Sequence, residues 1–142
     1  MQRTYTSTRP MGIVVIAVVA LTLATAYIHL GLGGLLFTLN AIGYAAFALA
    51  MVVIGTVSHP LVRRFDWLPR LGLLGYTLTT IVGYLVMGPY FSLGWVAKAI
   101  EVAILTLLIV DLRRAYGSPA GLVRAALASV GLGGVTRRIG LA

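Results

Sequence analysis

The sequence predicts an all-α integral membrane protein, an antiparallel up-down four-helix bundle with a C-terminal tail that is either amphipathic or disordered. Hydrophobic residues make up 60% of the 142 residues and charged residues only 10%, so the chain cannot cover itself with a polar surface in water. Four apolar stretches are each long enough to cross a hydrocarbon layer of about 30 Å. Nearly every cation lies between or beyond these stretches, as is typical of membrane topology.

The first span is predicted at residues 11–30, after a polar N-terminal segment, 1–10, that contains Arg3 and Arg9. Flanking arginines, an apolar run and an Ala-x-Ala triplet imitate a secretory signal. However, the apolar run continues past the triplet without a polar boundary, which favours an uncleaved anchor.

The second span is predicted at residues 35–57, after a glycine-rich turn at 31–34. Residues 58–70 are predicted to be a loop, because they contain four charged residues together with Pro60 and Pro69.

The third span is predicted at residues 71–87 and the fourth at 93–112, with a Gly-Pro break between them. The four spans together form a transmembrane domain over residues 11–112.

Residues 113–142 are predicted to be a basic cytoplasmic tail. Leu122, Ala126 and Val130 share one helical stripe, which indicates a helix lying on the membrane surface. Glycines within 131–134 interrupt any long helix, so a disordered tail is the alternative.

The distribution of cations predicts that both termini are cytoplasmic. With four spans, ten arginines fall on one side of the membrane, and the two remaining loops carry no charge. These arginines are Arg3, Arg9, Arg63, Arg64, Arg70, Arg113, Arg114, Arg124, Arg137 and Arg138. We expect them to meet anionic lipid headgroups and not nucleic acid, because they do not line one face of an element.

Small residues at helical spacing are predicted to form helix contacts, since close approach promotes helix association in lipid. Two such strips are present: Ala41, Ala45 and Ala48 in the second span, and Gly75, Thr79 and Gly83 in the third.

Six polar residues from all four spans are predicted to lie at similar depth in the outer half of the membrane. They are His29, Asn40, Tyr44, Tyr84, Lys98 and Glu101. Alternating chain directions bring the end of one span level with the start of the next, so we expect these residues to form one polar pocket.

Lys98 and Glu101 need the most explanation, because an ionised side chain at mid-span costs roughly 2.5–3.5 kcal/mol on insertion scales. At i and i+3 they share a helix face and can neutralise each other. The pair is interpreted either as part of a structural network or as a ligand, ion or proton site. His29, at the end of its span, is expected to be a solvated interfacial histidine.

The composition excludes several kinds of site. The chain has no cysteine, and its two histidines, His29 and His59, are about a membrane thickness apart, so neither Cys-ligated metals nor a bis-histidine haem are expected. No metal site, cofactor or catalytic set is predicted. A lipid- or quinone-directed enzyme with Glu101 or His29 as general base is a minor alternative.

The same residues carry a resemblance to a loose group of small, uncharacterised prokaryotic four-span membrane proteins. The shared pattern is Ile28-His29-Leu30, Asn40-Ala41-Ile42-Gly43-Tyr44, Gly75-Tyr76-Thr77 and Lys98-Ala99-Ile100-Glu101. The resemblance covers residues 11–112 and implies the helix count, without any activity.

The function expected from these features is that of a small polytopic membrane protein acting as a non-enzymatic structural or accessory component. It would act as a homo-oligomer or within a larger membrane complex. The alternative is a binder or transporter of a small molecule, ion or proton that uses Glu101, Lys98, Asn40 and His29.

Overall fold

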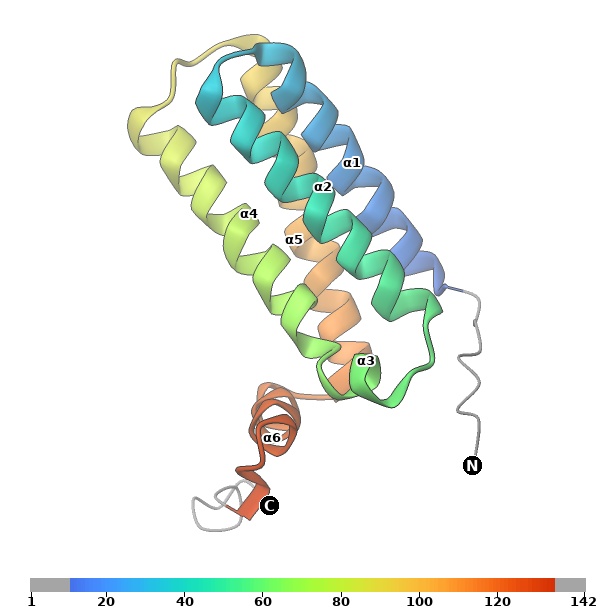
Figure 1. Cartoon of the computed structure of the whole chain (residues 1–142). Coiled ribbons are helices and arrows are strands. Elements are labelled where there is room, and N and C mark those ends of the chain that lie inside the picture. Colours follow the sequence, from blue (N-terminus) through green and yellow to red (C-terminus); the bar gives the residue numbers. More distant parts are fainter. Residues whose placement is uncertain (1–10, 135–142) are drawn as a thin grey trace.

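The computed structural model describes residues 11–134 and shows an antiparallel bundle of four long helices (Figure 1). These helices are α1 (Ile13–Leu32), α2 (Leu35–Thr56), α4 (Trp67–Met87) and α5 (Ser92–Tyr116). Each of the four is long and apolar enough to cross a membrane. The predicted fold class is confirmed.

The bundle has two ends, which differ in the connections between the helices (Figure 1). At one end, here called the hairpin end, α1 turns into α2 and α4 is joined to α5. The α1–α2 turn consists of Gly33 and Gly34, with φ angles of 69° and 81°, a conformation that favours glycine. The opposite, arginine end holds the described arginines Arg63, Arg64, Arg70, Arg113, Arg114 and Arg124.

The segment 58–70, predicted to be a loop, is largely helical, and that prediction is wrong. It contains the short helix α3 (Pro60–Arg64) and the first turn of α4. Pro60 is the first residue of α3, and Pro69 lies in the first turn of α4. Backbone N–H groups have no intrahelical partner at these positions, so proline is tolerated there.

The C-terminal tail includes helix α6 (Pro119–Ser129). Ser118 caps this helix, because its side chain accepts a hydrogen bond from the Gly121 backbone N–H at 3.1 Å. The predictions about Arg3, Arg9, Arg137 and Arg138 concern residues outside the described part of the chain.

The core runs along the axis of the bundle and is built from large apolar side chains with no exposed surface. They are Val18, Tyr44, Met51, Leu73, Ile104 and Leu108. Large apolar side chains on the outer surface of all four helices, such as Leu23, Leu49, Leu78 and Val102, are about half or more exposed. Such a surface suits lipid as the surrounding solvent.

The predicted small-residue strips pack only in part. Ala41 and Ala48 are buried, whereas Ala45 and Gly75 are exposed, and a Cβ atom added to Gly75 or Gly83 would meet nothing within 4 Å. The α4 strip is therefore not a contact face within this chain. Helix α4 instead turns the face with Leu73, Thr77 and Tyr84 into the bundle.

Candidate functional site

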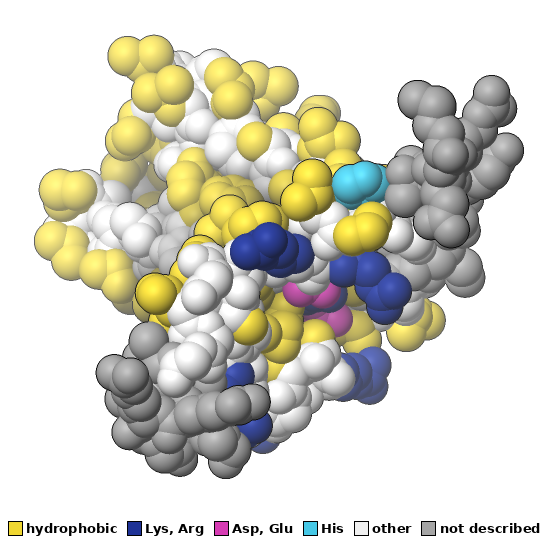
Figure 2. Space-filling model, turned by 60° about the horizontal axis from the view of Figure 1, so that its bottom comes forward, with side chains coloured by type: hydrophobic (Ala, Val, Ile, Leu, Met, Phe, Trp, Pro, Cys, Tyr) yellow, Lys and Arg dark blue, Asp and Glu magenta, His cyan; other side chains and the backbone are white. Residues whose placement is uncertain are grey.

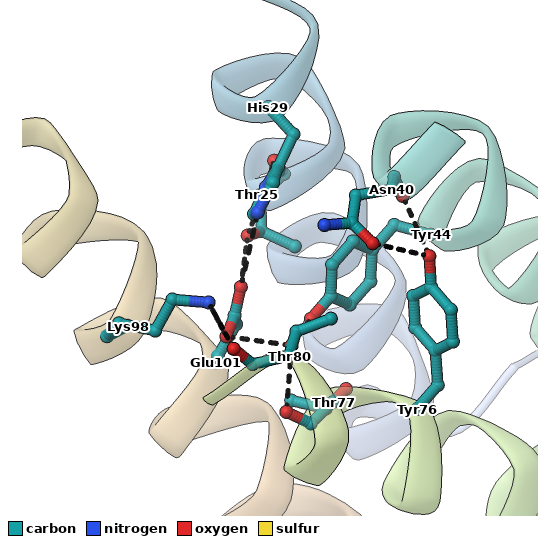
Figure 3. A network of polar contacts seen from close by, with 9 residues as sticks. All are labelled: Thr25, His29, Asn40, Tyr44, Tyr76, Thr77, Thr80, Lys98 and Glu101. Atoms are coloured by element: carbon teal, nitrogen blue, oxygen red, sulfur yellow. Dashed lines mark hydrogen bonds and ion pairs between the residues drawn. The ribbon is translucent and has the colours of Figure 1, made fainter. Parts of the chain in front are cut away.

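The six predicted site residues come from four different helices and lie in the half of the bundle near the hairpin end. His29 is on α1, Asn40 and Tyr44 are on α2, Tyr84 is on α4, and Lys98 and Glu101 are on α5. Figure 3 shows five of them around a common centre, together with Thr25, Tyr76, Thr77 and Thr80.

Glu101 is the centre of this polar network. Its side chain has no exposed surface, and its oxygen Oε2 accepts hydrogen bonds from Lys98 Nζ at 2.5 Å and Thr80 Oγ1 at 3.1 Å. The other oxygen, Oε1, accepts from Thr25 Oγ1 at 3.4 Å. A buried carboxylate with donors on both oxygens can stay ionised, because its charge is paired and hydrogen-bonded.

Lys98 points into the bundle, although its flexible stem could have reached the membrane surface. Only 7% of the residue is exposed, and its ammonium group donates to Glu101 and to the Thr80 carbonyl oxygen at 3.3 Å. The Tyr84 ring centroid lies 5.4 Å from Nζ, within the range of a cation–π interaction. Two of the three ammonium hydrogens are thus directed at oxygen acceptors.

His29 is buried, with 3% of the residue exposed, so its predicted role as a solvated interfacial histidine is wrong. Helix α1 continues to Leu32, two residues beyond the predicted span, and the His29 imidazole packs against the rings of Phe37 and Tyr44. His29 Nδ1 lies 2.8 Å from the Thr25 carbonyl oxygen. Because a carbonyl can only accept, Nδ1 carries the hydrogen.

The second ring nitrogen of His29 faces the acid. Nε2 is 3.8 Å from Glu101 Oε1, which is long for a hydrogen bond but short enough for an ion pair when the ring is protonated. With its hydrogen on Nδ1, the neutral ring presents the lone pair of Nε2 on the side of Glu101.

Tyr44 joins the network through a threonine. Its hydroxyl lies 2.6 Å from Thr80 Oγ1, which in turn can donate to Glu101 or to the Thr77 carbonyl at 2.8 Å. When Thr80 donates to Glu101, Tyr44 must donate to Thr80. Thr25 and Thr80 are outside the predicted six, although both lie one helical turn from a predicted residue and could have been found by that spacing.

Asn40 does not reach Glu101. Its side-chain oxygen accepts a hydrogen bond from the Tyr76 hydroxyl at 3.1 Å, and this bond links α2 to α4. The Tyr76 ring also meets the Tyr44 ring edge-on at 5.0 Å. Asn40 is therefore part of a neighbouring cluster that supports Tyr44.

Tyr84 also has no contact with Glu101, and it closes the site toward the hairpin end. The ring packs against Trp95 and over Gly94, where an added Cβ atom would lie 2.5 Å from the tyrosine hydroxyl oxygen. Its position beside Lys98 depends on this close approach between α4 and α5.

A cavity of about 260 Å³ lies beside the network. Its polar wall is formed mainly by His29, Asn40, Thr80 and Lys98, whereas Glu101 lies behind these residues and does not line it. The remaining wall is largely apolar, with Leu32, Phe37, Met87 and Ala97 among its residues. The arrangement suits a molecule with a polar head and an apolar body.

The polar atoms of the buried region are nearly all satisfied. Among residues 11–134, Thr77 Oγ1 is the only buried side-chain nitrogen or oxygen atom without a hydrogen-bond partner. The network therefore also joins the helices mechanically, as the structural interpretation of the sequence requires.

The described residues contain no group of three or more His, Cys, Asp or Glu that could hold a metal ion. The two histidines are at opposite ends of the bundle: His29 lies near the end of α1, and His59 caps α3. They cannot ligate one iron.

A second buried ion-pair network, which sequence reasoning missed, lies at the arginine end. Arg70 Nε is 2.6 Å from Asp111 Oδ2, and Arg70 Nη1 is 3.3 Å from Asp66 Oδ2. The Tyr116 hydroxyl donates to Asp66 Oδ1 at 2.5 Å. Arg70 immediately precedes the third apolar stretch and Asp111 lies near the end of the fourth, so matching their positions along antiparallel spans would have paired them.

Comparison with models of known families, with curated proteins and with solved structures finds no match to this chain. The site is therefore interpreted from its own geometry, and the resemblance to a group of four-span proteins stays a prediction.

Proposed function

We propose that the chain is a small polytopic membrane protein that binds a small amphipathic molecule in the cavity at the hairpin end. The observation that carries this proposal is that Lys98 and His29, which both approach Glu101, also form part of the cavity wall. A ligand would therefore reach both basic groups directly. Ionisable residues inside a membrane bundle are costly, and a binding role explains their presence.

The donors of the wall define the polar head of the ligand. Lys98 directs two of its three ammonium hydrogens at Glu101 and Thr80, which leaves one for a ligand. The head is accordingly a hydrogen-bond acceptor, such as a carbonyl or carboxylate oxygen. The apolar wall favours a hydrocarbon or ring-shaped body.

The size of the cavity limits how much of the ligand it encloses. At about 260 Å³ it is smaller than most sites for drug-sized ligands, which measure about 300–1,000 Å³. Leu36 on α2 and Thr79 on α4 line the cavity and are also exposed on the outside of the bundle. A longer apolar tail could leave between α2 and α4 into lipid.

Glu101 sets the charge of the site in this proposal. Ionised Glu101 and Lys98 together are neutral, so a carbonyl head enters without a change of charge. A carboxylate head adds a negative charge, which a proton on His29 Nε2 would balance. We therefore expect binding of a fatty acid, but not of a quinone, to take up a proton.

The binding proposal can be tested by filling the cavity through a glycine. Gly83 lines the cavity, and a side chain built on it has open space, so Gly83→Leu should occupy the cavity without displacing the helices. The matched control is Gly75→Leu, which is on the same helix, is equally open and lies outside the cavity wall.

A short-chain benzoquinone and decanoate serve as probes with a neutral and an anionic head. Binding to the purified full chain in detergent is measured by titration calorimetry in buffers of different ionisation enthalpy. We expect saturable binding of at least one probe, which Gly83→Leu abolishes and Gly75→Leu retains. Absence of binding, or equal binding to both variants, would contradict the proposal.

A second candidate is a structural or accessory role in a membrane assembly. The observation that favours it is the open strip of Gly75, Thr79 and Gly83 on α4, a kind of surface that a helix of another chain can approach closely. The chain has no native cysteine, so Gly75→Cys tests this role by crosslinking in membranes. Leu49→Cys, on an exposed face of α2, is the control.

We further propose that the arginine end faces the cytoplasm, because basic residues near the ends of spans set this orientation. Both termini would then be cytoplasmic. We assign no reaction to the site.

A further inference from the structure

A second cavity, of about 520 Å³, lies at the arginine end between α3, the last residue of α5 and α6. Arg63 and Arg64 of α3 line it, together with Asp66, Tyr116 and Ser129. Helix α6 forms one wall of the cavity. Ser129 holds α6 in this position, because it accepts hydrogen bonds from Arg64 and Trp67. The cavity is separated from the hairpin-end site by the length of the bundle.

The arginines of this cavity have hydrogen-bond donors to spare. Among the described residues, Arg63 has no ion pair and no hydrogen bond from its side chain. Arg64 uses Nε for the Ser129 carbonyl oxygen, at 2.5 Å, which leaves the terminal nitrogens of its guanidinium group. Two guanidinium groups with free N–H donors suit a planar or tetrahedral oxyanion.

The one acid that lines the cavity, Asp66, shares the single positive charge of Arg70 with Asp111. Asp66 accepts a hydrogen bond from Tyr116 on one oxygen and forms an ion pair with buried Arg70 on the other. Arg70 and its two acids together carry a net charge of −1, whereas Arg63 and Arg64 add two positive charges, so the net charge around the cavity is positive. Figure 2 shows the dark-blue cationic side chains of this end around the acidic ones.

The position of the cavity points to the source of the anion. It lies where the apolar parts of α4 and α5 end, beside Trp67, a residue type enriched at membrane–water interfaces. Lipid phosphates lie at this level of a bilayer. The volume also exceeds the needs of a bare phosphate ion and leaves room for the substituent of a headgroup.

We propose that this cavity binds the phosphate of an anionic lipid headgroup, with Arg63 and Arg64 as its donors. Because Arg64 also holds Ser129, the bound lipid would be fixed between α3 and α6. The inference requires a membrane location but does not depend on a ligand at the hairpin end.

The test uses Trp67 as a reporter in the full chain. Trp95 is the only other tryptophan, so Trp95→Phe leaves a single fluorophore beside the cavity. In detergent this protein is titrated with short-chain phosphatidylglycerol, with phosphatidylcholine of the same chain length, and with inorganic phosphate. We expect a saturable response to phosphatidylglycerol only.

Arg63→Gln removes one donor, and Arg124→Gln is its control, because Arg124 is an exposed arginine at the same end outside the cavity wall. We expect Arg63→Gln to weaken phosphatidylglycerol binding about tenfold and Arg124→Gln to leave it unchanged. Ala125→Leu, which fills the cavity and keeps every charge, should also abolish the response.

Three results would overturn the proposal. Equal weakening by Arg63→Gln and Arg124→Gln would show general attraction to a basic surface. An equal response to phosphatidylcholine would remove the role of the anionic headgroup. A response to inorganic phosphate as strong as that to the lipid would assign the site to a soluble anion.

Discussion

Glu101 and Lys98 show how a membrane bundle tolerates two charges where one would be prohibitive. Each neutralises the other at 2.5 Å, and two threonines and a backbone carbonyl complete the hydrogen bonds. Removal of one partner of such a pair lowers the stability of the protein much more than removal of both, because a buried unpaired charge remains.

Lys98→Met should therefore lower the free energy of unfolding by about 3–5 kcal/mol, because it leaves Glu101 unpaired. The double variant Lys98→Met/Glu101→Leu should recover most of this loss. Denaturant unfolding of the purified protein in mixed micelles measures both effects. If the single and double variants were equally destabilised, the two charges would not be coupled.

At the scale of helices, one close contact decides how α2 meets α4. The Tyr76 side chain lies directly over Gly43, and its hydroxyl donates to Asn40 on the same face of α2. Tyr44, the next residue along α2, packs its ring against Tyr76. The short segment Asn40–Tyr44 of α2 thus forms the packing surface for a single side chain of α4, that of Tyr76.

Gly43→Ala should displace Tyr76, because the added Cβ atom would overlap its hydroxyl. We expect a loss of about 1–3 kcal/mol in the free energy of unfolding, the usual cost of overpacking. Gly75→Ala, beside Tyr76 in sequence but facing open space, is the control and should cost nothing. Thermal unfolding of both variants followed by circular dichroism tests the difference, and equal midpoints would contradict it.

At the scale of the whole molecule, the two ends of the bundle differ in charge and in the cavity that each contains. The hairpin end has a largely apolar cavity next to a paired acid and base, whereas the cavity at the arginine end is lined by Arg63 and Arg64, which form no ion pair within residues 11–134. This polarity fits a protein held in one orientation in the membrane.

The orientation itself can be measured by thiol labelling, because the chain has no native cysteine. Tyr90→Cys places a thiol at the hairpin end, and Leu132→Cys places one beyond α6; both native side chains are at least half exposed. In intact cells a membrane-impermeant maleimide should label only the first variant, and the second should react only after permeabilisation. The reverse pattern would show that the arginine end faces outward.

The sequence by itself determined the number of long apolar helices and the level along the bundle at which the main polar residues lie. Both are properties of position along the chain: the lengths of the apolar runs predict four spans, and alternating directions bring His29, Tyr44 and Glu101 to one level. The prolines at 60 and 69 were misleading only because their effect depends on whether they start a helix or interrupt it.

Only the tertiary structure decided which way each side chain faces about its helix axis. Lys98 turns inward to Glu101, His29 is buried under aromatic rings, Asn40 pairs with Tyr76, and Arg70 meets Asp111. A helix that spans a lipid bilayer carries apolar residues on all of its faces, so hydrophobicity alone does not show which face points into the bundle. That rotation is set by packing between helices and by the hydrogen bonds that buried polar groups must find.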